Sequence, residues 1–386
     1  MNRLPPVVRG MLQGLAGATP DPPLAEDEHR SLLELADRTH CTLYLTGDEI
    51  AGPNLAKNAE RRRRLWLAYD EAAAALSLLG IEFVLLKGFT HEADFGIDPA
   101  RRYQSDLDLL CLPEDVGRAR AALQQAGYRD HGSAELSDDH ARPLVKPFTW
   151  RWRGDYYDPG LPISIELHHT LWSRGRDRIR TPEVHQFWSR RTNMTIAGRA
   201  VPTLAEPDRI AFAAVHVLRH ILRNNASPAH AFELACALTR RAGDRTFWQS
   251  WSRMHEAPFR ALQAVAFQFA HRWFGCSLAP VAEQECRALP EPVQAWFRDY
   301  AFSPLVNLVE PNKDVLWLHL ALLPNRGDRL AVGIRKLVPM HLPRPTERYE
   351  GLSRIRYHAV ALARLLLTAS RRRPPTAPST ASQTSD

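Results

Sequence analysis

FVLLKGFTHEADFGIDPARRYQSDLDLL, residues 83–110, contains two short apolar runs with charged residues beside each of them. The first run, EFVLL at 82–86, predicts a buried strand that ends at Lys87-Gly88. The second run, DLDLLCL at 106–112, predicts another strand, and residues 113–125 predict a helix that follows it. This alternation of strands and helix predicts a small sheet with helices packed against it.

Two acidic side chains lie two residues apart on the second predicted strand. Residues i and i+2 of a strand point to the same face, so Asp106 and Asp108 would project together while Leu107 is buried. Adjacent carboxylates repel each other and raise each other's pKa unless a cation lies between them. Mg²⁺ suits this arrangement, because it binds through one or two carboxylates and the phosphates of a substrate. Such pairs also occur at solvated strand ends, so the spacing alone leaves both interpretations open.

Basic residues and a third acid flank this pair. Lys87 supplies a positive charge suited to a triphosphate, and Gly88 lets backbone N–H groups approach an anion. Arg102 can bind a further phosphate oxygen in bidentate fashion. A later alternating segment predicts a strand with Glu166 and His168 on its polar face. Three carboxylates from two neighbouring strands, opposite a basic loop, predict a two-metal phosphoryl-transfer site.

These motifs resemble the uncharacterised nucleotidyltransferase family of the polymerase-β-like superfamily. The shared pattern is a hydrophobic strand ending in Lys-Gly, then Arg-x-x-x-Asp-hydrophobic-Asp, then a Glu-hydrophobic-His strand. Here the pattern stands at Lys87-Gly88, at Arg102–Asp108 and at Glu166-Leu167-His168. The resemblance covers residues 30–240 and departs from the usual family pattern at Glu233, where an Asp is common.

The resemblance implies an α+β fold: a small mixed nucleotidyltransferase sheet flanked by helices, with an N-terminal helical segment and a C-terminal all-helical region. It also implies magnesium-dependent transfer of a nucleotidyl group from an NTP, such as ATP, to an acceptor. The acceptor stays open: a small molecule, a natural-product precursor, a peptide or a protein.

Roles for individual residues follow from the resemblance. Asp106 and Asp108 would bind magnesium, and Glu166 would be the third acid and the candidate general base. Lys87, Gly88 and Arg102 would contact the nucleotide phosphates. For His168, two interpretations stay open. It either orients an acid or contacts a phosphate, or it is a partly buried polar residue of the strand.

The chain divides into five predicted segments. These are a poorly ordered N-terminus at 1–27, N-terminal helices at 28–80, the catalytic core at 81–200, a helical C-terminal domain at 201–369 and a disordered tail at 370–386. Within the core, Phe148, Trp150 and Trp152 alternate with polar residues. They predict a strand that forms a hairpin with residues 163–168, with the tryptophans in the sheet core rather than stacked on bases.

Three further features have a structural and a functional interpretation. We expect the run Arg61–Arg64 to be a solvated helix face rather than a phosphate-binding patch. His216 and His220 are spaced i, i+4 on a helix, and without a third ligand in the sequence pattern we expect packing or hydrogen bonding rather than metal binding. The basic final helix, residues 348–369, is expected to pack on the helical domain rather than on a membrane.

Composition sets outer bounds on function. The chain has 386 residues, 45% of them hydrophobic and 24% charged, which is typical of a globular protein with a substantial core. No apolar run approaches the roughly 18 residues of a membrane span, and the N-terminus lacks a signal-peptide pattern, so we expect a cytoplasmic protein. Five cysteines without a CxxC pair predict reduced, buried thiols and no structural zinc.

Two other classes of function compete with the enzyme. A non-catalytic module would keep the fold and bind a nucleotide or a partner, but such a module has no need for three repelling carboxylates. The net charge of +7 permits nucleic acid as a partner, yet the sequence has no zinc finger, RRM signature or clear helix-turn-helix. We therefore do not expect a nucleic-acid partner.

Overall fold

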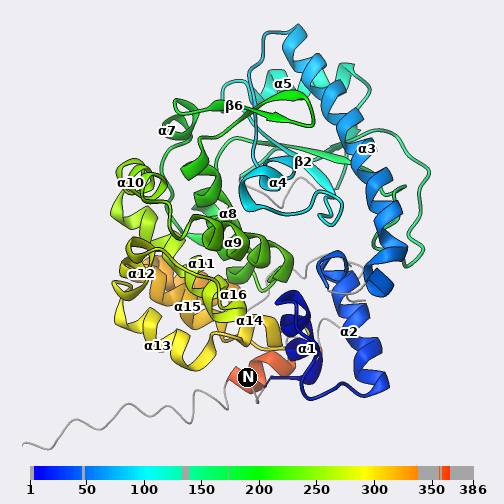
Figure 1. Ribbon diagram of the computed structural model, residues 1–386. Helices are drawn as coiled ribbons and strands as arrows, with labels where there is room; N and C mark the ends of the chain where they lie inside the picture. The colour runs from blue at the N-terminus through cyan, green and yellow to red at the C-terminus, as the bar shows by residue number, and fades with distance from the viewer. Residues whose placement is uncertain are drawn as a thin grey trace, which may run out of the picture.

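Seven strands form one mixed sheet in the computed structural model, which describes residues 4–45, 48–132, 139–172, 174–337, 356 and 359–365. The strand order is β3-β4-β5-β2-β1-β7-β6. Figure 1 labels β2, within the sheet, and β6, at one of its edges. The strands are β1 Val84–Leu85, β2 Asp106–Leu110, β3 Arg129–Asp130, β4 Leu144–Val145, β5 Ser164–His168, β6 Thr192–Ile196 and β7 Arg199–Thr203. The predicted α+β class and small mixed sheet are confirmed.

Strand β2 lies in the middle of the sheet. It pairs in parallel with β5 and antiparallel with β1, and β1 in turn pairs in parallel with β7. The predicted strands at 82–86 and 106–112 are thus present, although β1 is shorter than expected. The β6–β7 hairpin, which the sequence analysis did not predict, closes one edge of the sheet.

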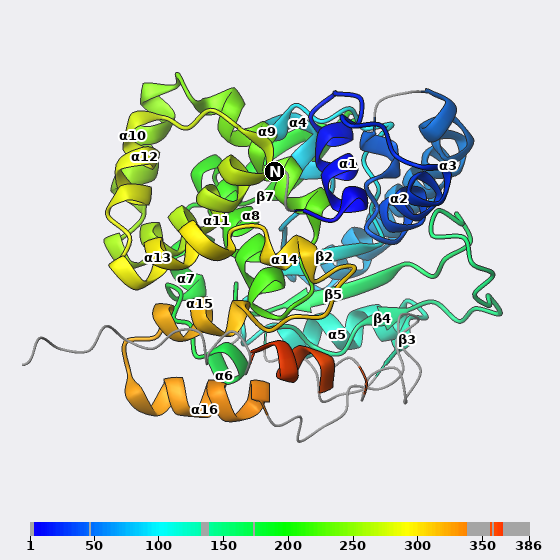
Figure 2. The ribbon, with the colours of Figure 1, turned by 90° about the horizontal axis from the view of Figure 1, so that it is seen from below.

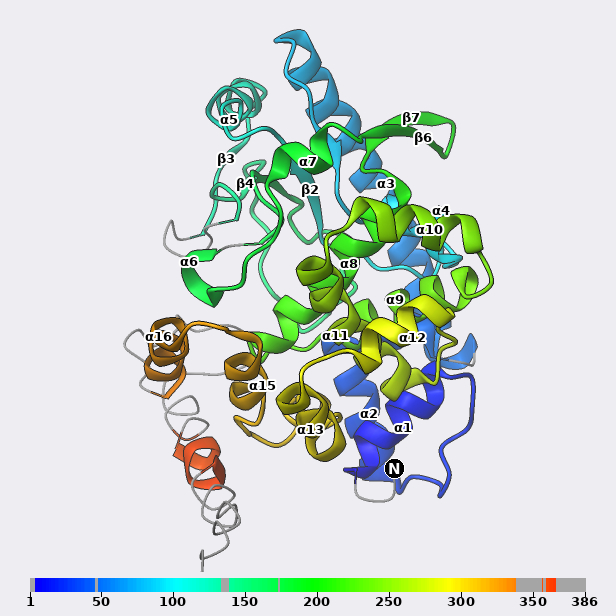
Figure 3. The ribbon, with the colours of Figure 1, turned by 90° about the vertical axis from the view of Figure 1, so that its left-hand side faces the viewer.

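Helices cover both faces of the sheet. Helices α3 (Asp48–Leu78) and α5 (Val116–Gln125) pack on one face, and α8 (Glu206–Leu222) and α9 (Pro228–Arg241) lie on the other. Figures 2 and 3 show α5 and α8 on opposite sides of β2. The remaining helices are α1 Pro6–Leu15, α2 Glu26–Arg38, the 3₁₀ helix η1 Thr42–Tyr44, α4 Phe89–Phe95, α6 Arg174–Asp177, α7 Val184–Trp188, α10 Arg245–Met254, α11 Ala257–Phe274, α12 Pro280–Arg287, α13 Glu291–Tyr300, α14 Ser303–Val306, α15 Val315–Leu322 and α16 Arg326–Leu337.

The two faces of β2 belong to two hydrophobic cores. Leu107 and Leu109 pack with Trp66 of α3 and Leu123 of α5. Leu110, on the opposite face, belongs to the larger core that continues through α8, α9 and α11. Because neighbouring residues of a strand point to opposite faces, this burial turns Asp106 and Asp108 toward the layer of α8 and α9.

The N-terminal segment differs from the prediction for residues 1–27. Pro6 occupies the first turn of α1, where proline is well tolerated, instead of interrupting structure. Gly10 lets α1 approach α2 closely, since a Cβ there would lie 2.7 Å from a methyl of Leu32. Met11 and Leu12 are buried in the larger core. Pro6 and Gly10 therefore serve helix initiation and helix packing.

The predicted hairpin around the two tryptophans is wrong. Residues 148–152 form no strand, and β4, which lies just before Pro147, takes the place beside β5. Proline cannot donate to a ladder, so the pairing stops there. The indole of Trp150 donates a 2.7 Å hydrogen bond to Asp158 in the following loop.

The prediction of a solvated face for Arg61–Arg64 is wrong at Arg61. This side chain is 1% exposed and donates to the backbone carbonyls of Gln104, Ser105 and Leu161. Arg64 likewise donates to the carbonyl of Pro159. Buried carbonyls that lack a strand partner need donors, and the guanidinium provides several at once.

Other predictions concern the end of the chain and the cysteines. The tail at 370–386 lies outside the described residues, and of the final helix at 348–369 only residues 356 and 359–365 are described. In the part of the chain that the structure describes, no helix has the length and apolar character to cross a bilayer. All five cysteines are free thiols, and four of them are buried.

Leu12 tests whether α1 belongs to the folded core. This side chain is 2% exposed, so we expect Leu12→Ala to lower the free energy of unfolding by about 2–5 kcal/mol. The matched Leu67→Ala, at a residue that is 55% exposed on α3, should change it by less than about 0.5 kcal/mol. Urea denaturation measures both. Small and equal losses would show that residues 6–15 do not contribute to the core.

Candidate functional site

The pairing of β2 with β5 brings four of the predicted site residues together. In the parallel register Asp108 lies opposite Glu166, Asp106 opposite Ser164 and Leu110 opposite His168. Since alternate residues share a face, Asp106, Asp108, Glu166 and His168 all project from the side of the sheet that α8 and α9 cover.

Lys87 and His168 neutralise this acidic face. The Lys87 ammonium Nζ lies 3.1 Å from Asp108 Oδ2 and 3.6 Å from Asp106 Oδ2. His168 Nε2 lies 2.9 Å from Asp108 Oδ1 and 3.7 Å from Glu166 Oε2. Asp108 and His168 are almost fully buried, whereas the side chains of Asp106 and Glu166 are each 21% exposed. The cluster is therefore buried at its base and open to solvent at one side.

The two aspartates have opposite pKa shifts. Burial, together with repulsion from Asp108, raises the pKa of Asp106 to about 6. Burial also disfavours the Asp108 carboxylate, but Lys87 and His168 outweigh it and hold the pKa of Asp108 well below its usual range. Burial likewise opposes the His168 cation, yet its hydrogen bonds to Asp108 and Glu166 raise the pKa of His168 to about 9. Asp106 therefore loses its proton at a higher pH than Asp108 does.

The donor set fits a divalent cation. Asp108 Oδ2 is buried without a hydrogen-bond partner, and the ammonium of Lys87 lies 3.1 Å from it. Asp108, Glu166 and His168 each offer a ligand atom within 4.8 Å of the others. Carboxylate oxygens are the ligands that Mg²⁺ prefers. Asp106 lies beside this group rather than within it.

Gly88 lies where only glycine fits. Its φ of 77° and ψ of −118° lie in a backbone region that residues other than glycine rarely adopt. A Cβ atom at this position would come within 2.4 Å of the Gln104 side-chain amide. That amide donates a 2.6 Å hydrogen bond to the Asp106 carbonyl. Arg61 binds the carbonyls of residues 104 and 105. These contacts fix the chain at the start of β2.

The structure places Arg102 in a second cluster, against Glu233 of α9. Arg102 Nη2 lies 3.2 Å from Glu233 Oε2, and His91 Nδ1 lies 2.8 Å from the same oxygen. Tyr44 donates its hydroxyl to Glu233 Oε1 at 2.8 Å. Burial opposes the Glu233 carboxylate, but Arg102 and His91 outweigh it and keep the pKa of Glu233 well below its usual range.

Sequence reasoning missed several residues that the site contains. His140 Nε2 lies 3.6 Å from Glu166 Oε2 and reaches it from a bridge beside β5. His91 and Tyr44 approach Glu233 from segments far from α9 in the sequence. The one related signal in the sequence is Glu233, where the family usually has an Asp, but the sequence does not indicate which residues contact it.

Much of the chain matches a known protein family. Residues 53–275, more than half of the chain, match a family described as uncharacterised nucleotidyltransferases. The chain belongs to this nucleotidyltransferase family. The match includes Lys87-Gly88, both aspartates of β2, Glu166 and α9. No curated protein and no solved structure matches the chain. The predicted resemblance to this nucleotidyltransferase family is confirmed.

Gly88→Ala tests the close approach to Gln104. The control is Gly80→Ala, because Gly80 also has a positive φ, of 62°, but has no atom within 4 Å of the Cβ position. We expect Gly88→Ala to cost about 1–3 kcal/mol more stability than the control, from the added steric clash. Thermal or urea unfolding measures the difference. Equal losses for the two variants would mean that Gln104 imposes no constraint.

Glu233→Gln tests the buried pair with Arg102. The substitution leaves Arg102 without a counter-charge, so we expect a loss of about 3–5 kcal/mol near neutral pH. The pKa of Glu233 is lowered in the folded protein. Its stabilisation is therefore present above the unfolded pKa of about 4.3 and disappears as the pH falls below it.

The difference between the wild type and Glu233→Gln should accordingly shrink in acid, which urea unfolding at several pH values measures. The control is Glu82→Gln, which breaks a pair with Arg191 at a glutamate side chain that is 65% exposed. That variant should lose less than about 1 kcal/mol. A pH-independent difference for Glu233→Gln would contradict the charge assignment.

Proposed function

We propose that this nucleotidyltransferase moves a nucleotidyl group from an NTP to an acceptor nucleophile with the help of Mg²⁺. The observation that carries the proposal is the in-register pairing of β2 with β5, which sets Asp108 opposite Glu166 with Asp106 on the same face. The family supports nucleotidyl transfer as the reaction type. The acceptor's oxygen would form a bond to the α-phosphorus while the bond to the bridging oxygen breaks and pyrophosphate leaves.

In this proposal the acids hold the metal and Lys87 changes its partners. Asp106, Asp108 and Glu166 would bind magnesium, which neutralises phosphate charge and aligns the reacting oxygens in a two-metal arrangement. Lys87 lies within 3.6 Å of both aspartates, so a cation held there would free its ammonium to contact the phosphates. Gly88, with its positive φ, gives the backbone next to Lys87 its conformation. Glu166, partly exposed, is the candidate base that accepts the acceptor's proton.

Arg102 and His168 would act by positioning. Arg102 is buried against Glu233, so in the structure it holds α9 near the site rather than presenting its guanidinium to solvent. His168 donates to Asp108 and lies near Glu166, which fixes the orientation of both carboxylates. Groups held in this way lose less entropy when substrate binds.

One observation favours a second candidate, the non-catalytic module. Lys87 already compensates Asp106 and Asp108, so the fold does not need a metal to relieve their repulsion. A nucleotide-binding module with a self-compensated cluster would bind NTP with the same affinity in the presence and absence of Mg²⁺. The enzyme, in contrast, needs the metal to bring NTP phosphates against three acids.

Nucleotide binding by calorimetry separates the two. We expect the wild type to bind at least one of the four NTPs more than tenfold more tightly with Mg²⁺, because the metal screens the phosphates from the carboxylates. Asp108→Asn should lose this gain. The control Asp70→Asn, which breaks an exposed pair with Arg199, should keep it. Equal binding with and without Mg²⁺ would favour the nucleotide-binding module. No binding to any NTP would contradict both the transferase and the nucleotide-binding module, and would leave the module that binds a partner.

A further inference from the structure

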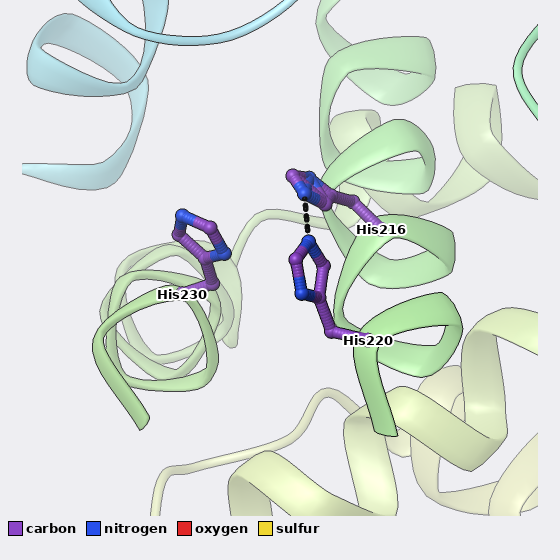
Figure 4. A group of neighbouring side chains, drawn as sticks. All are labelled: His216, His220 and His230. Atoms are coloured by element: carbon purple, nitrogen blue, oxygen red, sulfur yellow. Dashed lines mark hydrogen bonds between the residues drawn. The ribbon is translucent and has the colours of Figure 1, made fainter. Parts of the chain in front are cut away.

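Three histidines from two helices converge beside the acidic cluster. His216 and His220 lie one turn apart on α8, and His230 reaches them from the start of α9 (Figure 4). Nε2 atoms of His216 and His220 are 2.8 Å apart, and the ring centroid of His230 lies 4.7 Å from that of His216 and 5.5 Å from that of His220. Each ring offers a nitrogen within 4.8 Å of the others.

The hydrogen bonds around these rings leave nitrogens available. His220 Nδ1 lies 3.2 Å from the backbone carbonyl of Asn225, closer than the side-chain amide of that residue at 3.5 Å. A carbonyl can only accept, so Nδ1 carries the proton and Nε2 keeps its lone pair toward His216. His230 Nδ1 is buried and has no hydrogen-bond partner. Packing alone does not explain why a buried ring nitrogen of His230 lacks a hydrogen bond while it lies near ring nitrogens of His216 and His220.

The neighbouring charges are already balanced. Three cations act electrostatically on these histidines: Lys87 and Arg219 on His216, and Lys87 and Arg102 on His230. Lys87 pairs with the two aspartates of β2, Arg219 with Asp139 and Arg102 with Glu233.

Burial lowers the pKa of His230 to about 3, and it is also the largest of the effects that hold the pKa values of His216 and His220 well below the usual range. All three imidazoles are therefore neutral, which is the form that binds metal ions.

We propose that His216, His220 and His230 form a binding site for a divalent transition-metal ion such as Zn²⁺. Imidazole ligands suit zinc and its neighbours rather than Mg²⁺, and three histidines with one open position are a known zinc geometry. At a Zn–N distance of about 2.0–2.1 Å, tetrahedral ligands lie about 3.3 Å apart. The His216–His220 pair would thus open by a few tenths of an ångström, and the metal would replace their hydrogen bond.

His230 supplies the third ligand that the sequence pattern around His216 and His220 lacks. It lies beyond the turn between α8 and α9, so the ion would clamp these two helices together. Helix α9 also carries Glu233, so the clamp would act on the element that holds Arg102. The site differs from the acidic cluster in chemistry: nitrogen ligands on helices in one case, oxygen ligands on strands in the other.

Cobalt substitution tests the site on the full chain. The protein is stripped with a chelator and titrated with Co²⁺, whose d–d absorption bands become intense in a tetrahedral site. We expect saturation at one equivalent, bleaching by Zn²⁺ and no competition from Mg²⁺. If the stripped wild type develops no such band, or if Mg²⁺ displaces the cobalt, the proposal is wrong, whatever the variants do.

Variants locate the ion. We expect His230→Gln to weaken Co²⁺ binding by about 100-fold or more, because even changes outside the ligand set of a metal cost 10–100-fold. His185→Gln, at a histidine side chain that is 64% exposed, should bind as the wild type does. Asp108→Asn should also keep the cobalt band. Retention in a folded His230→Gln protein, or loss in Asp108→Asn, would overturn the assignment, with far-UV circular dichroism as the check on folding.

Discussion

Buried charges between the sheet and the helices that cover it are compensated by partners from distant parts of the chain. Lys87 meets the aspartates of β2, and Arg102 meets Glu233 more than a hundred residues later. Arg209 of α8 pairs with Asp94 of α4 in the same layer. Removing charges from water is costly unless each has a counter-charge, so these pairs require the helices to pack in one arrangement. The geometry of the acidic cluster depends on that packing.

The sequence predicted what depends on short-range spacing. The period of two along a strand placed Asp106 with Asp108 and Glu166 with His168, because burial of the intervening leucines fixes which face they share. The two strands were also expected to be neighbours, but their parallel pairing was not predicted and is seen only in the structure. Where a residue's neighbours come from elsewhere in the chain, as for Arg61 and for residues 148–152, local pattern predicted the wrong environment.

The partners of Glu233 and the position of His230 were outside the reach of that reasoning. A carboxylate that receives Tyr44, His91 and Arg102 requires three segments to meet at α9, and no spacing in the sequence reports such a meeting. The same holds for His140, whose contact with Glu166 arises from a single bridge beside β5. Loop and helix packing, rather than periodicity, selects these residues.

The hydroxyl of Tyr44 comes from a segment that precedes the region shared with the family, residues 53–275. Helix α1 lies outside that region too, yet Met11 and Leu12 fill the same core as α11. A fragment trimmed to the family boundaries would leave a Glu233 oxygen without its donor, at a cost of about 1–3 kcal/mol, and would uncover apolar surface. The region that matches the family is thus smaller than the part of this chain that shares one hydrophobic core.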